Sequence, residues 1–479
     1  MAFFEILIQI SKILVVLILA PFSFYNLFIP YNATKREKNF FFCACLGIGI
    51  PFVSFIFLLS IRLFQDQSFY TLFFITIVPF FIYSFFNIKN LKLFIIDNFK
   101  FPLKLKFTFN FILFFILVLI SLLLLSCVLF PVIQNDSIEY FYIAKTILNK
   151  SFIQNYPSKD AIDGLILPLT HPLGFPSYIA FGGVLQDPDF QVLNSKFFIV
   201  LIPIVISFIL IKIAVYEKSI KNPFIATFLI LTFPLFFFIA FGFHIDPIRC
   251  LTFFSASLFA YLTIKRENYS NYFLLGLSVG LSWFVHSTGL LTLLILFSLV
   301  FLINIQKTKK TLIYLTISLL ACISVIIFDL IKVYDVMGSI FGDLYTIDIA
   351  KQYKEEFLHF RKLDRGVSSI SEKFFYGFGR IFFEYRNFGF FYIITLPACF
   401  FYFKRKIKHI RNVNSFLDFS SLIVFMFYLG VVFATLIGIE TFLQNYRYTL
   451  QPILNMALIG SLFIEKVFFR HEIVLFRKA

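Results

Sequence analysis

The sequence has few charged residues for its length. Only 14% of its 479 residues are Asp, Glu, Lys or Arg, whereas a soluble domain is usually about a quarter charged. It also lacks heptad repeats, low-complexity linkers and a polar stretch long enough to form a separate soluble domain. These absences exclude a water-soluble globular protein and a coiled coil.

Cysteine is scarce, and its spacing fits neither a disulfide framework nor a metal site. The six cysteines lie in or beside apolar runs, and Cys43 and Cys45 form a C-x-C pair, not the C-x-x-C of redox and zinc sites. No internal repeat is evident, which argues against transporters built from repeats. The apolar N-terminus contains Glu5 and no basic region, so residues 4–29 are predicted to be a retained span, not a cleaved signal peptide.

Apolar side chains dominate instead. They make up 60% of the residues, the mean hydropathy is +0.90, and runs such as 111–130 reach the roughly 20 residues that a helix needs to cross a bilayer. The sequence therefore predicts an all-α polytopic membrane protein with about 13 transmembrane helices. The predicted spans lie near residues 4–29, 40–61, 69–87, 108–133, 196–216, 223–241, 248–264, 272–304 (two short helices), 311–333, 386–403, 416–438 and 448–468.

The net charge of +16 does not indicate a nucleic-acid partner, because Lys and Arg gather in short loops between the apolar runs. The positive-inside rule places such loops in the cytoplasm, with the N-terminus outside and the C-terminus inside. The basic loops are 33–39, 88–107, 265–268, 307–310 and 404–411. The longer loops 134–195 and 334–385 are then external, and the lipid bilayer surrounds the rest.

Two segments need a special assignment. Segment 171–186 is apolar but only about 16 residues long, and Pro172, Gly174 and Pro176 interrupt it. A full crossing would move the following basic loops outside, so we predict a re-entrant or interfacial element within the external loop 134–195. Segment 272–304 holds 33 residues between two basic loops, so we predict two helices with a turn at 285–289.

The polar residues after the fourth predicted span are the strongest functional signal. Asp136 follows that span by about three residues, where a low dielectric makes an unpaired carboxylate costly. Acidic residues at such a boundary are often functional. A helix that begins there places Asp136, Glu139 and Tyr140 on one face. From the residues alone, Asp136 could act as a general base, hold a cation or bind sugar hydroxyls.

The polar stretch belongs to a longer pattern. Residues 136–148 fit D-S-x-x-Y-x-x-x-A-x-x-x-L, and residues 171–180 fit H-P-x-G-[FY]-P-x-x-x-A. Three further segments follow in order: FHIDPIR (243–249), GLSVGLSWFVHSTGLL (276–291) and NYRYTLQPIL (445–454). Together they resemble the membrane glycosyltransferases of the C-type fold, the superfamily of dolichyl-phosphate-mannose protein mannosyltransferases and lipid A aminoarabinose transferases. The resemblance covers roughly residues 108–468.

The resemblance implies a division of the chain into four parts. Residues 1–107 add three spans and a cytoplasmic loop ahead of a seven-span glycosyltransferase-like module at 108–333. The external loop 334–385 follows. Residues 386–479 then form three more spans and a cytoplasmic tail.

The resemblance also implies a function. Its members take a sugar from a polyprenyl-phosphate-linked donor and pass it, with inversion, to a lipid, glycan or protein. The reaction is expected on the extracytoplasmic side of a bacterial inner (plasma) membrane. Asp136 would be the catalytic base, and Arg447 the first candidate for the cation that stabilises the leaving phosphate. The other residues expected to bind donor or acceptor are Glu139, Tyr140, His171, Asp246, Arg249, His286 and Tyr448. His286 stands where relatives often carry Lys.

The resemblance does not firmly imply any cofactor. Some relatives use a divalent cation, but the sequence shows no full ligand set, so metal ligands stay unassigned.

Simpler explanations of single residues stay open. Arg447 could be an interfacial snorkelling residue. His286 could be a polar residue satisfied at a helix break, and Asp246 and Arg249 could simply pair at i, i+3.

Three other functions also stay open. A carrier or flippase of lipid-linked sugars would need a polar path across the bilayer, and Asp329 is one of the rare ionisable residues in a predicted span. A noncatalytic membrane subunit of the same fold is the second alternative. An O-antigen ligase or polymerase is the third.

Overall fold

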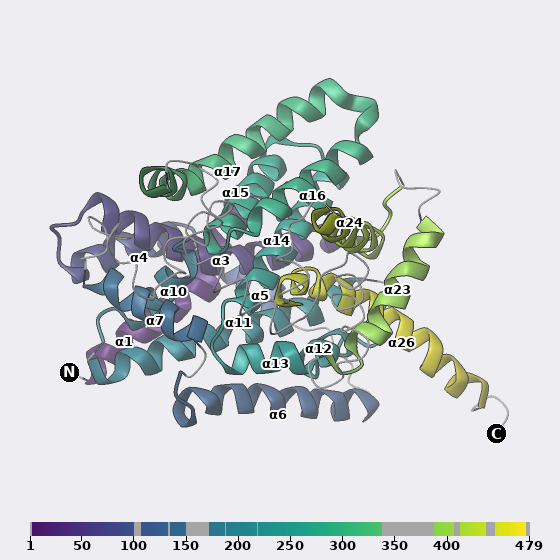
Figure 1. Cartoon of the computed structure of the whole chain (residues 1–479), viewed down its shortest axis with the longest axis horizontal. Helices are drawn as coiled ribbons and strands as arrows, with labels where there is room; N and C mark the ends of the chain where they lie inside the picture. The colour runs from purple at the N-terminus through teal and green to yellow at the C-terminus, as the bar shows by residue number, and fades with distance from the viewer. Residues whose placement is uncertain are drawn as a thin grey trace.

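The computed structural model describes most of the chain, and in the described residues the secondary structure is helical, with no strand (Figure 1). The described residues are 2–99, 107–132, 135–149, 172–186, 188–217, 219–337, 388–406, 412–436 and 446–475. The helices are α1 (Ala2–Leu14), a π-helical stretch η1 (Val15–Leu19), α2 (Ala20–Phe28), α3 (Lys35–Leu63), α4 (Phe69–Phe86), α5 (Ile88–Phe99), α6 (Phe107–Leu129), α7 (Asn135–Leu148), α10 (Gly174–Gly183), α11 (Pro188–Tyr216), α12 (Ile225–Leu231), α13 (Pro234–Phe241), α14 (Asp246–Lys265), α15 (Tyr269–Val285), α16 (Gly289–Ile303), α17 (Thr308–Met337), α23 (Phe391–Lys406), α24 (Phe416–Leu436), the 3₁₀ turn η5 (Tyr446–Leu450) and α26 (Ile453–Leu475).

Seven helical stretches among these residues are long and apolar enough to cross a membrane. They are Phe4–Phe28, Lys35–Leu63, Phe69–Phe86, Phe111–Leu129, Gln191–Tyr216, Asp246–Lys265 and Ile305–Ile331, with two shorter apolar helices at Gly289–Ile303 and Phe416–Val432. The chain is therefore a helical protein suited to a membrane. The total of about 13 spans stays a prediction.

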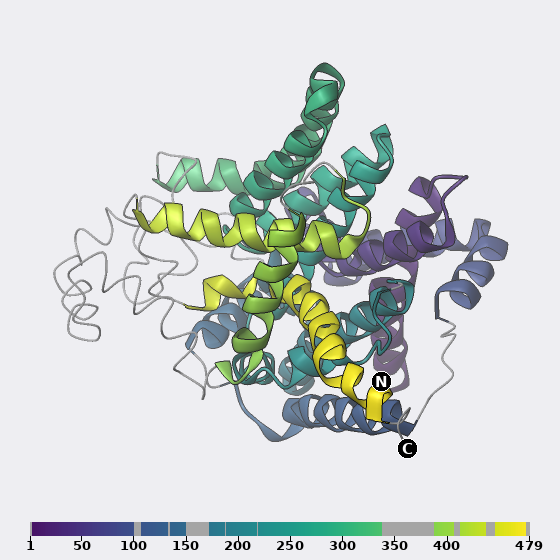
Figure 2. The same ribbon diagram turned by 90° about the vertical axis from the view of Figure 1, so that its right-hand side faces the viewer.

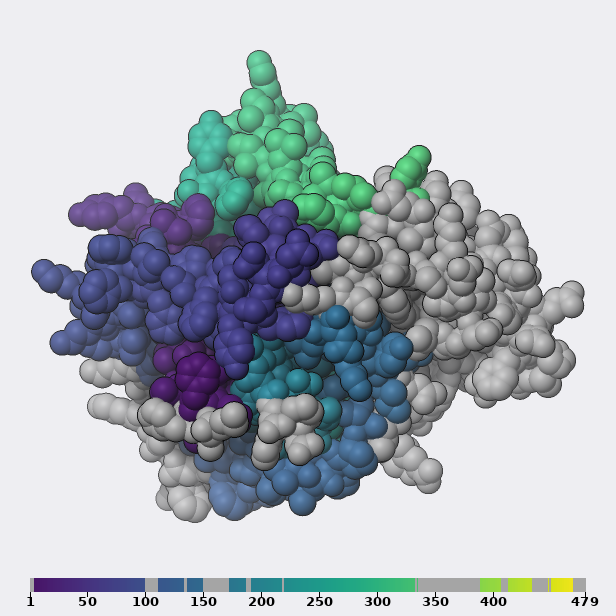
Figure 3. Space-filling view, turned by 90° about the vertical axis from the view of Figure 1, so that its left-hand side faces the viewer, coloured from purple at the N-terminus to yellow at the C-terminus, as the bar shows by residue number. Residues whose placement is uncertain are grey.

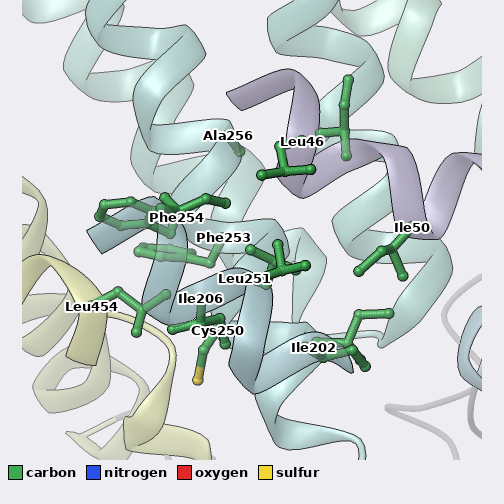
Figure 4. Packing of buried hydrophobic residues seen from close by; sticks show 14 of the residues in the cluster. Leu46, Ile50, Ile202, Ile206, Cys250, Leu251, Phe253, Phe254, Ala256 and Leu454 are labelled. Atoms are coloured by element: carbon green, nitrogen blue, oxygen red, sulfur yellow. The ribbon is translucent and has the colours of Figure 1, made fainter. Parts of the chain in front are cut away.

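Helix α14 forms the centre of the helical core. Its side chains are buried along almost its whole length, and Leu251 and Phe253 lie among residues of three other helices (Figure 4). Those neighbours include Leu46 of α3, Ile206 of α11 and Leu454 of α26. Lipid tails are as apolar as these side chains, so close van der Waals packing, not exclusion of water, has to hold such helices together.

Helix α6 has the opposite character. It lies along the base of the core against α11, α12 and α13, as Figures 1 and 2 both show. Apart from Ser121, the side chains described as exposed on this helix are apolar, such as Phe111 and Phe114, and its 23 residues contain no charged side chain. A helix of this kind is suited to contact with lipid.

The N-terminal helices are tied to the short helix α10. Lys12 of α1 is fully buried, and its Nζ donates hydrogen bonds to the carbonyl oxygens of Gly182 (2.9 Å) and Val184 (2.6 Å). A cation at this position matches the negative end of the α10 dipole. The N-terminal part of the chain, purple to violet-blue in Figure 3, covers much of one face.

Three expectations about helix boundaries can be compared with the described residues. The turn predicted at 285–289 is confirmed, because α15 ends at Val285 and α16 begins at Gly289. The span predicted near 223–241 contains two helices, because α12 and α13 are separated at residues 232–233. Pro234 lacks a backbone N–H and keeps Phe233 extended, which ends the first helix there. Segment 171–186 contains the buried ten-residue helix α10, which packs against α7.

Helix α14 also defines two ends of the core. It runs from Asp246 to Lys265, about 30 Å at 1.5 Å per residue. Two of the loops predicted to be cytoplasmic meet at the Lys265 end, where Arg266 pairs with Glu37 at 3.0 Å. Lys265 also donates to the carbonyl oxygen of Val413 at 2.7 Å. The candidate functional residues gather at the other end.

Glycine allows α15 and α17 to approach each other closely. A Cβ added at Gly276 would lie 2.0 Å from the carbonyl oxygen of Ser318, and one at Gly280 would lie 2.8 Å from that of Cys322. We expect Gly276→Ala to lower the free energy of unfolding by about 1–3 kcal/mol, as other overpacked sites do. Gly430→Ala in α24 is the matched control, because its nearest neighbour would be 3.6 Å away. Thermal unfolding in detergent would compare them, and equal midpoints would contradict the prediction.

Candidate functional site

Helix α7 begins where the sequence predicted a functional boundary. Asp136 lies in its first turn, where the helix dipole favours a negative charge. The next residue, Ser137, is buried and donates a hydrogen bond from Oγ to the carbonyl oxygen of Gly242 at 2.9 Å. The start of α7 is thereby attached to the turn between α13 and α14.

That turn has an unusual backbone conformation. Phe243 has φ of 59°, in the left-handed region that costs an L-residue about 1–2 kcal/mol. Its side chain is completely buried, and Lys196 Nζ lies 5.4 Å from its ring centroid. Packing therefore offsets the strain. The turn places His244 between the start of α7 and the start of α14.

Five residues from three segments form a closed ring of polar contacts, with four links between side chains and one to a backbone carbonyl. His244 contacts Asp136 through Nε2 (3.0 Å to Oδ2) and Asp246 through Nδ1 (2.8 Å to Oδ2). Asp246 Oδ1 lies 2.9 Å from Nη1 of Arg249. Arg249 Nη2 donates to the carbonyl oxygen of Arg447 at 3.0 Å, and Arg447 Nη2 lies 2.8 Å from Oδ2 of Asp136.

Burial divides this ring into a deep part and an accessible part. His244, Asp246 and Arg249 are almost fully buried. The side chains of Asp136 and Arg447 are 33% and 28% exposed, so chemistry with a bound molecule would take place at this edge. Two carboxylates balance two guanidinium groups, and the protonation of His244 therefore decides whether the ring is neutral or carries one positive charge.

The ring changes the acidity of its members. The hydrogen bond with His244 is the main factor that lowers the pKa of Asp136, the charge of Arg447 lowers it further, and burial opposes both. Burial alone would lower the pKa of His244, but the carboxylates of Asp246 and Asp136 raise it on balance. Asp136 is therefore ionised at neutral pH, and in this arrangement it is a weak base.

The structure brings together four of the residues that the sequence singled out. Asp136, Asp246, Arg249 and Arg447 all belong to the ring. The i, i+3 pair of Asp246 and Arg249 is present, but both residues also contact other members. Arg447 is paired with Asp136 and is not merely an interfacial side chain.

Two more candidates lie on α7 beside the ring. Tyr140 is buried, with its ring centroid 6.3 Å from that of His244 and 5.2 Å from that of Phe175 in α10. The helix that follows Asp136 therefore packs on the predicted re-entrant segment. Glu139 is half-buried, one residue before Tyr140, and is not a member of the ring.

His286 has a structural contact at the break between α15 and α16. Its Nδ1 accepts a hydrogen bond from the backbone N–H of Thr288 at 3.1 Å. Gln451, just after η5, donates to Thr288 Oγ1 at 2.8 Å. The interpretation of His286 as a satisfied polar residue at a helix break fits these contacts.

Some predicted features fall outside the described part of the chain. His171 and the side chain of Tyr448 are among them, as is nearly all of the predicted external loop 334–385. Within the described residues, no group of three or more His, Cys, Asp or Glu side chains is arranged to hold a metal ion.

Sequence reasoning missed His244, the residue at the centre of the ring. The segment FHIDPIR was recognised, but only its acidic and Arg residues were weighed. The available signal was the spacing of His244 two residues before Asp246, directly ahead of a helix start.

Comparison of the chain with protein-family models, curated proteins and solved structures gives no match. The function therefore has to be inferred from the chemistry of the ring.

Proposed function

We propose that this protein is a membrane glycosyltransferase that moves a sugar from a polyprenyl-phosphate-linked donor to an extracytoplasmic acceptor. The supporting observation is the meeting of Asp136 with Arg447, residues 311 positions apart, at the accessible edge of one ion cluster. A carboxylate can accept a proton, and a guanidinium fork suits a phosphate. The two groups that the transfer requires are therefore neighbours.

The reaction can be written with these residues. The oxygen or nitrogen of the acceptor attacks the anomeric carbon, and Asp136 takes the proton that this hydroxyl or amine loses. The bond between that carbon and the phosphate oxygen breaks, and its electron pair stays on the departing polyprenyl phosphate. Arg447 stabilises the charge that develops on the phosphate. A single displacement of this kind inverts the anomeric configuration.

The ring leaves one carboxylate oxygen suited to this role. The contacts with His244 Nε2 and Arg447 Nη2 both fall on Oδ2 of Asp136. Among the described residues these two cations therefore leave Oδ1 as the oxygen that would face the acceptor.

The lipid tail of the donor has an apolar surface close by. Helix α6 ends at Leu129, a few residues before α7 begins, and its last turns expose Leu125, Val128 and Leu129. A polyprenyl chain lying along α6 in the bilayer would bring its phosphate toward Asp136 and Arg447.

The test uses purified protein in liposomes with a polyprenyl-phosphate-linked sugar, labelled in the sugar, and membrane extract as the source of acceptor. We expect polyprenyl phosphate to be released in step with labelled product. Movement of intact donor across the bilayer without cleavage would indicate that the protein is a carrier and not a transferase. Neither cleavage nor movement would leave the noncatalytic subunit as the better explanation.

A further inference from the structure

His244 Nε2 contacts two groups that it cannot satisfy together. It lies 3.0 Å from a carboxylate oxygen of Asp136, to which it can only donate. The same nitrogen is in close contact with Nη1 of Arg447, which is itself only a donor. An imidazole nitrogen carries either a hydrogen or a lone pair, so one of the two contacts must be unfavourable.

The neighbours of His244 decide which contact is unfavourable. Asp136 on one side and Asp246 on the other favour hydrogens on both ring nitrogens, and they raise the pKa of His244. With Nε2 protonated, the bond to Asp136 is made, and Arg447 faces a like charge. Tyr140, whose ring meets that of His244 edge-on, is a further titratable side chain beside it.

The two cationic partners of Asp136 also differ in how firmly they are held. The His244 side chain is 3% exposed and fixed at both ring nitrogens, whereas the Arg447 side chain is 28% exposed and extends from a five-residue 3₁₀ turn. Arg249 holds the backbone carbonyl of Arg447. Arg447 is therefore anchored through its backbone, and its side chain is the more accessible of the two cations.

We propose that Asp136 and a phosphate-bearing lipid compete for Arg447, and that His244 is the positioning residue that holds Asp136 when Arg447 leaves. The choice of a polyprenyl phosphate as the anion rests on the proposed function; the exchange itself rests on the ring geometry. Loss of one cationic partner makes Asp136 a stronger base. Basicity thus rises only after the donor has bound, so the donor binds before the acceptor reacts.

Competition for Arg447 can be measured by binding without any transfer. The probe is a polyprenyl monophosphate, titrated into the full-length protein in lipid nanodiscs. Asp136→Asn removes the competitor and should tighten binding by about tenfold, the order expected for coupled neighbouring charges. Arg447→Gln should weaken binding by about as much. The double variant should match Arg447→Gln alone, because the gain acts through Arg447.

The matched control is Asp66→Asn. Asp66 is exposed between α3 and α4, at the same end of the core as the ring, and the substitution makes the same change in charge. It should leave the affinity unchanged. If Asp136→Asn still tightens binding in the Arg447→Gln background, the gain comes from the loss of charge repulsion between Asp136 and the phosphate. That result would contradict the exchange at Arg447. Unchanged affinity in Asp136→Asn, or no binding by any variant, also overturns the exchange.

The positioning role of His244 has its own readout. His244→Ala should lower the rate of transfer at saturating donor while changing phosphate affinity by less than about twofold, and His244→Gln, whose amide can donate to Asp136, should recover part of the rate. Equal loss in both variants would contradict this role. If no protein variant transfers sugar but the binding pattern holds, the exchange stands and the proposed function fails.

Discussion

Asp136→Asn is expected to lower the rate of sugar transfer by about 10²–10⁴-fold, the usual range for loss of a general base. Asn keeps the shape of the side chain but neither takes a proton nor carries a charge. The pKa of Asp136 lies below its ordinary value, so the wild-type carboxylate is ionised at neutral pH. The measurement is the initial rate of labelled-sugar transfer in liposomes at saturating donor.

Two comparisons separate this effect from misfolding. Asp136→Glu keeps the carboxylate and should retain more activity than Asp136→Asn. All variants should reach the membrane in normal amounts, because the Asp136 side chain is one-third exposed. Arg447→Lys keeps the charge without the fork, so it should weaken donor binding less than Arg447→Ala. A wild-type rate in Asp136→Asn would exclude the proposed chemistry.

The helical membrane class could be predicted from the sequence because bilayer thickness fixes the length of apolar runs. The break between α15 and α16 could also be predicted, since an even number of crossings had to fit between two basic loops. The start of α7 near Asp136 followed from the end of the preceding apolar run. In each case the prediction uses only neighbouring residues in the sequence, and the thickness and sidedness of the membrane limit the possible helix lengths and crossings.

The pairing within the ring could not be predicted in the same way. Asp136 and Arg447 meet because α7, the turn before α14 and η5 pack at one end of the core, and no local pattern encodes that packing. His244 was missed because its role depends on neighbours from two other segments. The break at Phe233 was missed because an apolar run with a proline can be a kinked helix or two helices.

Asp246→Asn is expected to have the largest effect on stability, a loss of about 3–5 kcal/mol in the free energy of unfolding. Asp246 is fully buried and faces both Arg249 and His244, so its removal takes the negative charge from between two buried basic groups. Adding Arg249→Gln removes one of those cations. The double variant should therefore be less destabilised than the sum of the single variants.

The loss in Asp246→Asn should also depend on pH. Asp246 and Asp136 raise the pKa of His244 above its unfolded value of roughly 6.5. Protonated His244 therefore stabilises the fold fully below about pH 6.5, and this contribution disappears as the pH rises through the folded pKa. Asn cannot supply the carboxylate charge, so the difference between wild type and Asp246→Asn should be larger at about pH 6 than at about pH 9. Unfolding in mixed micelles at both values would measure it, with Asp66→Asn as the control. A difference that stays constant with pH would mean that His244 is neutral in the folded protein.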